Sequence, residues 1–172
     1  MLPLVPIADV DADAVEALLD RAFGTDRLAK TAYRVREGLA PIASLSFAAI
    51  GDGGHLAATI QCWPVALHLD AGEQVPMVMV GPIAVDPARQ LAGLGQRLTH
   101  HALAMADRSA LAGAQAQMLV GDPEYYARFF GFSDSPTRDW RLPGPFERRR
   151  LLARGMVPTG AGIVVPRVPA LA

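Results

Sequence analysis

The stretch VMVGPIAVDPARQLAGLGQRL, residues 78–98, decides the fold class of this 172-residue chain. It begins as an apolar run typical of a strand and passes through Asp86-Pro87 into a loop. Two glycines, Gly93 and Gly95, then stand where an apolar helix pattern starts. Glycine permits a positive φ and a close approach to a ligand, and the first N–H groups of a helix have no partners within it. The stretch therefore predicts a strand–loop–helix unit whose turn suits a phosphate or pyrophosphate.

Two familiar phosphate-binding motifs do not fit this turn. A dinucleotide fingerprint needs a third glycine at position 98, which is Leu98. A P-loop needs Gly-Lys-Ser/Thr, and the only lysine of the chain, Lys30, lies far upstream.

The segment Gln90–Gly95 does fit the pattern Gln/Arg-x-x-Gly-x-Gly/Ala. It resembles the acetyl-CoA signature of the GNAT (GCN5-related) N-acetyltransferase superfamily. A strand ending GPIAVDP (81–87) precedes it, as in many GNAT sequences, and LVGDPEYYARFFGF (119–132) resembles the second family block. The Gly-Asp-Pro-x-Tyr-Tyr form is similar to the bacterial YhbS-like branch, and the resemblance spans roughly Leu4 to Phe132.

Working outward, periodicity and turn residues predict alternating helices and strands in a mixed α/β (α+β) chain. Asp122 should cap a helix that has Pro123 at its first position, and Gly81-Pro82 should form a bulge or a splay within its strand. The other predicted elements are strands near 5–7, 43–50, 55–69, 75–85 and 117–120, and helices over 15–22 (capped by Asp11 or Asp13), 25–37 and 94–111.

The resemblance implies the GNAT fold: a central mixed, mostly antiparallel, twisted sheet of about six or seven strands, splayed between strands four and five, with about four helices. We expect one domain over residues 1–172, with a core of about 1–132 and C-terminal strands or tail over 133–172. The acceptor should be set by the first two helices, the hairpin loop and the C-terminal segment.

The resemblance also implies which residues bind acetyl-CoA, the co-substrate. The backbone of the fourth strand holds the pantetheine arm, and backbone N–H groups of the turn hold the pyrophosphate. Arg89 and Arg97 either add charge near the phosphates or are solvated arginines. The cofactor-binding residues are Ile83, Ala84, Val85, Arg89, Gln90, Leu91, Ala92, Gly93, Leu94, Gly95 and Gln96.

A tyrosine after the fifth strand usually protonates the leaving thiolate in this family. The resemblance places that role on Tyr126, with Tyr125 second; the alternative is that both tyrosines only pack. Related blocks usually carry one phenylalanine before Gly-Phe, whereas Phe129-Phe130 stand here. One extra residue rotates a helix by about 100°. Strands 75–85 and 117–121 contain no acid, so a water relay or an amine that arrives neutral replaces a general base.

The resemblance implies an N-acetyltransferase that acts on a primary amine of a small molecule or peptide, by direct attack on the thioester. The alternative is an acyl-CoA-binding regulatory module without transfer activity. The family often forms homodimers. The third reading is an unrelated α/β binding domain with a chance match to the motif.

Composition excludes other classes. Charged residues make up 19% of the chain and the net charge is -1, so no overall basic field attracts nucleic acid or anionic lipid. Cys62 is the only cysteine, which rules out an internal disulfide and a thiolate zinc cluster; we expect no metal, and Cys62 should be a buried small hydrophobe. The sequence shows no signal peptide and no membrane span, so we expect a cytoplasmic protein.

Overall fold

A long antiparallel pair of strands, β3 (Leu56–Leu69) and β4 (Gln74–Val85), forms the centre of the sheet in the computed structural model. The structure describes residues 1–89 and 93–168. The remaining strands are β1 (Leu4–Pro6), β2 (Phe47–Ile50), β5 (Ala116–Val120), β6 (Trp140–Arg141), β7 (Leu151–Gly155) and β8 (Gly162–Pro166). The helices are α1 (Ala12–Phe23), α2 (Thr31–Val35), α3 (Leu94–Asp107) and α4 (Pro123–Phe130), with short 3-10 turns η1 (Ile7–Asp9), η2 (Thr25–Ala29), η3 (Ala43–Leu45), η4 (Asp52–Gly54), η5 (Pro87–Arg89) and η6 (Arg148–Arg150).

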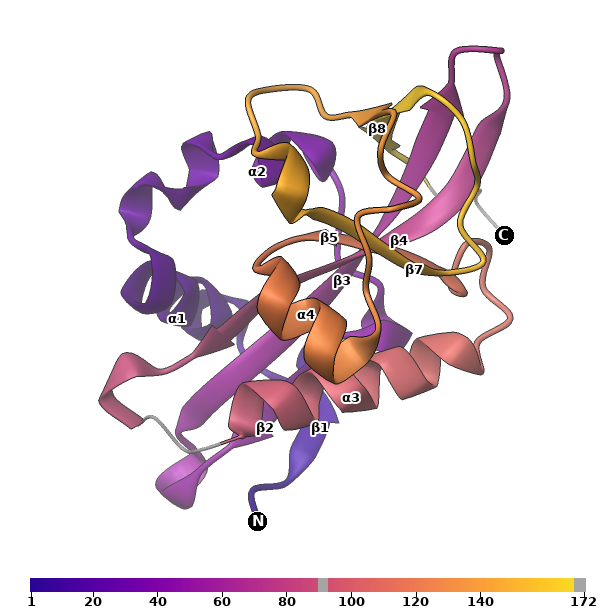
Figure 1. Cartoon of the computed structure of the whole chain (residues 1–172). Helices are drawn as coiled ribbons and strands as arrows, with labels where there is room; N and C mark the ends of the chain where they lie inside the picture. The colour runs from indigo at the N-terminus through magenta and orange to yellow at the C-terminus, as the bar shows by residue number, and fades with distance from the viewer. Residues whose placement is uncertain (90–92, 169–172) are drawn as a thin grey trace.

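Over the described residues the sheet has eight strands in the order β1-β2-β3-β4-β5-β7, with β8 on β3 and β6 on β8. Pairing is antiparallel except between β4 and β5 and between β6 and β8. This confirms the predicted mixed, mostly antiparallel GNAT fold (Figure 1). The count exceeds the expected six or seven because the C-terminal segment adds the two-residue strand β6 as well as β7 and β8.

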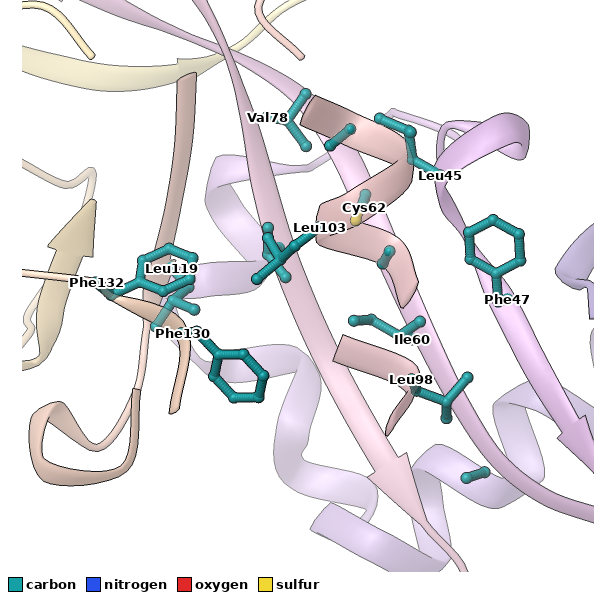
Figure 2. Packing of buried hydrophobic residues seen from close by; sticks show 14 of the residues in the cluster. Leu45, Phe47, Ile60, Cys62, Val78, Leu98, Leu103, Leu119, Phe130 and Phe132 are labelled. Atoms are coloured by element: carbon teal, nitrogen blue, oxygen red, sulfur yellow. The ribbon is translucent and has the colours of Figure 1, made fainter. Parts of the chain in front are cut away.

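Helices cover both faces of the sheet. Successive residues of a strand point to opposite faces: on β2, Phe47 and Ala49 pack in the cluster that includes α3, whereas Ala48 packs in the cluster that includes α1. Figure 2 shows Leu98 and Leu103 of α3 near Ile60 and Cys62 of β3. Cys62 is buried, as predicted, and burial raises the pKa of its thiol to about 12.

Two predicted helices differ from those observed. The helix expected over 25–37 is broken at Lys30, which is extended, into η2 and α2. The break follows from Arg27, because its guanidinium turns back to Glu16 and Asp20 of α1. The helix expected over 94–111 ends at Asp107, whose carboxylate is held by Arg154 at 2.9 Å.

Candidate functional site

Strands β4 and β5 separate in the middle of the sheet. Their pairing covers Val78 with Gln117 and Met79 with Met118, and no further pair of these strands is found among the described residues. The register between β3 and β4 also shifts there, since Cys62 pairs with Val80 but Ile60 pairs with Ile83. This is the bulge that Gly81-Pro82 predicted. The β5 side of β4 beyond the bulge therefore has backbone groups that an added extended chain can pair with.

The predicted strand residues lie on this open part of β4. Ile83 and Val85 pack toward α3, and Ala84 is buried on the α1 face. On the other edge, Ile83, Ala84 and Val85 pair with β3.

The turn that follows β4 ends in the N-terminus of α3. Gly93 is the N-cap residue and has a left-handed backbone with φ of 78°, and no side-chain hydrogen bond caps the helix among the described residues. Gly95 lies against β4: a Cβ there would stand 3.5 Å from Val85 Cγ2, an ordinary contact that explains why the motif accepts alanine. Leu94 is buried and Gln96 half-buried.

Of the two arginines expected near the phosphates, the structure shows the side-chain contacts of Arg97 only. Arg97 donates to the carbonyl oxygen of Leu2, so one of its guanidinium nitrogens is already occupied by the protein. The predictions for the Arg89 side chain and for Gln90, Leu91 and Ala92 lie outside the described residues.

Asp86 stabilises the start of the loop between β4 and α3 through contacts of its carboxylate. The sequence analysis assigned no role to this residue. Its carboxylate accepts from the Ala88 N–H at 3.0 Å and contacts His55 Nε2 at 2.9 Å, with Arg21 at 3.5 Å. The Ala88 N–H, the hydrogen bond with His55 and the charge of Arg21 together lower the pKa of Asp86.

Tyr126 lies on α4, next to the end of β5. Asp122 caps the helix by accepting from the Glu124 N–H at 3.1 Å, with Pro123 in the first turn, as predicted. The Tyr126 ring packs over Gly121, where a Cβ would stand 2.5 Å from Tyr126 Cε2. Burial raises the pKa of the Tyr126 hydroxyl to about 12, so it is protonated at neutral pH.

Tyr125 is half-buried, and its ring lies edge-on to that of Tyr126 at a centroid distance of 4.9 Å.

The extra phenylalanine of the block is accommodated at the end of α4. Phe129 is exposed and Phe130 buried, and Gly131 ends the helix in the left-handed conformation. Both tyrosines still line one cleft.

A cleft of about 960 Å³ lies beside the separated strands. One side is the β4 bulge from Met79 to Ile83, together with the end of β5 and both tyrosines. The opposite walls come from η2 and α2 and from the segment 142–150, two of the three regions expected to set the acceptor. The loop 51–55, the third region, does not line it. In Figure 1, α4 lies in front of the sheet and α2 at its upper end.

The cleft is also lined by two charged residues that the sequence analysis did not identify. Arg36 is buried, and Glu147 places a carboxylate on the C-terminal wall. No motif marks either residue. Asp122, the other cleft carboxylate, serves as the α4 cap.

The fold, the separated strands and the glycine turn define the class of protein. The family model for the acetyltransferase (GNAT) domain matches residues 5–133. This chain therefore belongs to the GNAT acetyltransferase family.

The relatives agree with that assignment. The uncharacterized N-acetyltransferase YhbS of Escherichia coli K12 is 32% identical over 136 residues, which cover 79% of this chain and 76% of the relative. The crystal structure of E. coli YhbS in complex with CoA has a TM-score of 0.69 at 26% identity and covers 97% of this chain and 89% of that one. A GNAT family acetyltransferase from Brucella melitensis in complex with acetyl-CoA shares the fold, with a TM-score of 0.61 at 24% identity, covering 98% and 97%.

The described residues show neither a metal-binding cluster nor a membrane-spanning helix. No group of three or more His, Cys, Asp or Glu side chains could hold a metal ion. None of the helices in the described part of the chain is long and apolar enough to cross a membrane.

Proposed function

We propose that this protein transfers an acetyl group from acetyl-CoA to a primary amine, by direct attack of the amine on the thioester. One observation carries the proposal: the same cleft is lined by the β4 bulge, where β5 leaves the strand, and by the protonated Tyr126. A reactive thioester placed at this bulge would meet an amine entering through the cleft.

The residues present fit acetyl-CoA. Beyond Met79 the β5 side of β4 is open to an extended pantetheine arm, with Ile83, Ala84 and Val85 as the pairing strand. The N-terminus of α3 at Gly93, which no described side chain caps, presents backbone N–H groups at the positive end of the helix dipole, and these suit a pyrophosphate. Such a site needs no basic surface, which agrees with a net charge of -1. Acetyl-CoA supplies the activated acetyl group.

The protein's own groups then act on the reacting atoms. A backbone N–H at the β4 bulge polarises the carbonyl oxygen and stabilises the negative charge that develops on it. A C–N bond forms and the C–S bond breaks, and the Tyr126 hydroxyl hydrogen-bonds the departing sulfur. The ammonium proton leaves through water or is lost before binding, because β4 and β5 carry no acidic residue beside the bulge and Asp122 serves as the α4 cap.

Binding and transfer are tested separately. Acetyl-CoA at 100 times its Kd should stabilise the protein by about 2.7 kcal/mol and raise its Tm. A panel of amines, amino acids and short peptides with free N-termini should include at least one acceptor that gives CoA thiol release and an acetylated product. Absence of a Tm shift, with no heat of binding in calorimetry, would sink the proposal.

The second candidate is an acyl-CoA-binding regulatory module. Two observations favour it: β4 and β5 carry no acidic residue that could act as a general base, and α4 ends in the extra phenylalanine of Phe129-Phe130. Tight acetyl-CoA binding with no product across the whole panel would support the module over the enzyme.

A further inference from the structure

The cations of the cleft differ in how their charge is balanced. Arg27 is buried but fully engaged: it donates to Asp20 at 3.0 Å, to Glu16 at 2.5 Å and to the Tyr33 hydroxyl oxygen at 2.8 Å. Burial acts to lower the pKa of Arg27, but these three hydrogen bonds outweigh it and raise the pKa. Arg27 therefore forms structural ion pairs with Glu16 and Asp20, and we do not expect it to bind a ligand.

Arg36 is the contrasting case. It is only 6% exposed, and its guanidinium carbon lies 3.8 Å from the centroid of the Tyr33 ring and 4.4 Å from that of Trp63. Its Nη1 has no hydrogen-bond partner, and no carboxylate lies within 4.0 Å of it among the described residues. Burial lowers the pKa of Arg36. Tyr33 and the more distant charge of Glu16 act to raise the pKa but do not outweigh the burial. A buried arginine that forms no ion pair gains from an anion that binds beside it.

Arg36 is connected to the proposed reaction centre. Trp63, over which its guanidinium lies, donates from Nε1 to the Gly81 carbonyl oxygen at 2.8 Å, at the bulge of β4. Arg36 lines the same cleft as Gly81 and Tyr126. It also lines an adjoining cavity of about 600 Å³, where the buried Gln61 Oε1 likewise has no partner.

We propose that the acceptor amine carries a carboxylate, which Arg36 binds, so that the acceptor is a free amino acid or a closely related molecule with an apolar body. This inference rests on the proposed function. The planar guanidinium fork matches a carboxylate, and the apolar side chains of Phe23, Leu142 and Phe146 also line the cleft and can contact an apolar body.

An acceptor with a carboxylate fits the charges of the cleft better than a polyamine or a phosphate ester does. A polyamine would bring a second positive charge to a cleft that also holds Lys30 and Arg150, against the two carboxylates of Asp122 and Glu147. A phosphate ester fits the same guanidinium fork. It carries about two negative charges at neutral pH, however, and the single guanidinium of Arg36 balances only one of them.

The test compares matched acceptors with the full chain and acetyl-CoA, using CoA thiol release. The probes are L-phenylalanine, its amide, its decarboxylated counterpart phenethylamine, phosphoethanolamine and spermidine. We expect kcat/KM for L-phenylalanine to be at least tenfold above that for every other probe. Equal or better acetylation of the amide, phenethylamine, phosphoethanolamine or spermidine would overturn the inference and leave the proposed function intact.

Variants then assign the preference to Arg36. Arg36→Gln should raise KM for L-phenylalanine at least tenfold with a smaller change in kcat, and should change kcat/KM for phenethylamine less than threefold. Arg36→Lys should recover part of the loss, because it keeps the charge without the fork. Arg138→Gln, at an exposed arginine outside the cleft, is the matched control and should behave as wild type. An equal loss for all acceptors in Arg36→Gln would show a structural role and contradict the inference.

A binding measurement covers the cases in which Arg36→Gln does not fold or no probe is acetylated. Calorimetry with phenylacetate and the CoA-saturated wild-type protein should detect binding, at least tenfold tighter than that of phenethylamine. The Arg36→Lys variant should bind phenylacetate more weakly than wild type does. No detectable phenylacetate binding would overturn the carboxylate inference, whereas failure of CoA itself to bind would overturn the proposed function.

Discussion

Removal of the Tyr126 hydroxyl is the sharpest test of the proposed chemistry. The pKa of Tyr126 is raised to about 12 by burial, whereas an ordinary thiol has a pKa of about 8.5. Complete proton transfer from this tyrosine to a thiolate is thus uphill by about 3.5 pKa units, or roughly 5 kcal/mol. Tyr126 should therefore act chiefly through a hydrogen bond to the developing thiolate.

A hydrogen bond to a charged group contributes about 1.5–3 kcal/mol. At about 1.4 kcal/mol per factor of ten, Tyr126→Phe should lower kcat by about 10- to 150-fold, the lower end of general acid effects. The free energy of unfolding should change by less than about 0.5 kcal/mol. No hydrogen bond to this hydroxyl is found among the described residues, and phenylalanine keeps the ring over Gly121.

The assay is steady-state acetyl transfer between pH 6 and 10 with the best acceptor of the panel, alongside thermal unfolding of each variant. Tyr125→Phe is the comparison variant and should change kcat less than threefold, because in the proposed mechanism only the Tyr126 hydroxyl hydrogen-bonds the departing sulfur. A Tyr126→Phe variant with kcat within threefold of wild type would refute the assignment. A fall in wild-type kcat near pH 8 that disappears in Tyr126→Phe would refute the argument from the raised pKa.

Four further substitutions test how the structure positions the residues of the candidate site. Gly121→Ala should displace the Tyr126 ring, because its Cβ would stand 2.5 Å from Cε2; we expect a lower kcat and a loss of about 1–3 kcal/mol in urea unfolding. Asp122→Ala removes the α4 cap and should cost about 1 kcal/mol of stability in the same measurement. The lowered pKa of Asp86 contributes stability that is present above its unfolded pKa of about 3.9 and is lost as pH falls through the folded value. Asp86→Asn should flatten this acid limb in a series of Tm measurements, and His55→Gln should reduce it only in part.

The parts of the fold that the sequence predicted are those with local signals. Alternation and turn residues located β3 and β4, and Asp122-Pro123 located the start of α4. The helix predicted over 25–37 was wrong because its break depends on ion pairs between Arg27 and α1, which no local pattern encodes. Strand β8 was not predicted separately because its pairing with β3 joins residues about 100 positions apart.

The contrast between local signals and long-range contacts also applies to the two sides of the candidate site. The acetyl-CoA side is contiguous in sequence, so its glycines and tyrosines could be recognised together. The acceptor side is assembled by contacts between distant segments: the Thr31 hydroxyl donates to the Pro145 carbonyl oxygen at 2.5 Å, and Arg34 donates to the Pro143 carbonyl oxygen at 3.2 Å.

Gly144 makes that acceptor wall possible, and its role is visible only in three dimensions. A Cβ at Gly144 would stand 2.7 Å from Thr31 Oγ1 and 3.0 Å from Arg34 Nη1, so a larger residue would push the segment 142–150 away from α2. Its backbone does not need a positive φ; the requirement is the close approach itself. Arg36 directly follows α2, and Glu147 lies on the segment that packs against α2 at Gly144. This close approach and the two hydrogen bonds therefore place both residues on the proposed acceptor side. Because the turn at Gly93 lies on other elements, we expect substitutions at Gly144 to change the preference among acceptors while leaving the affinity for acetyl-CoA unchanged.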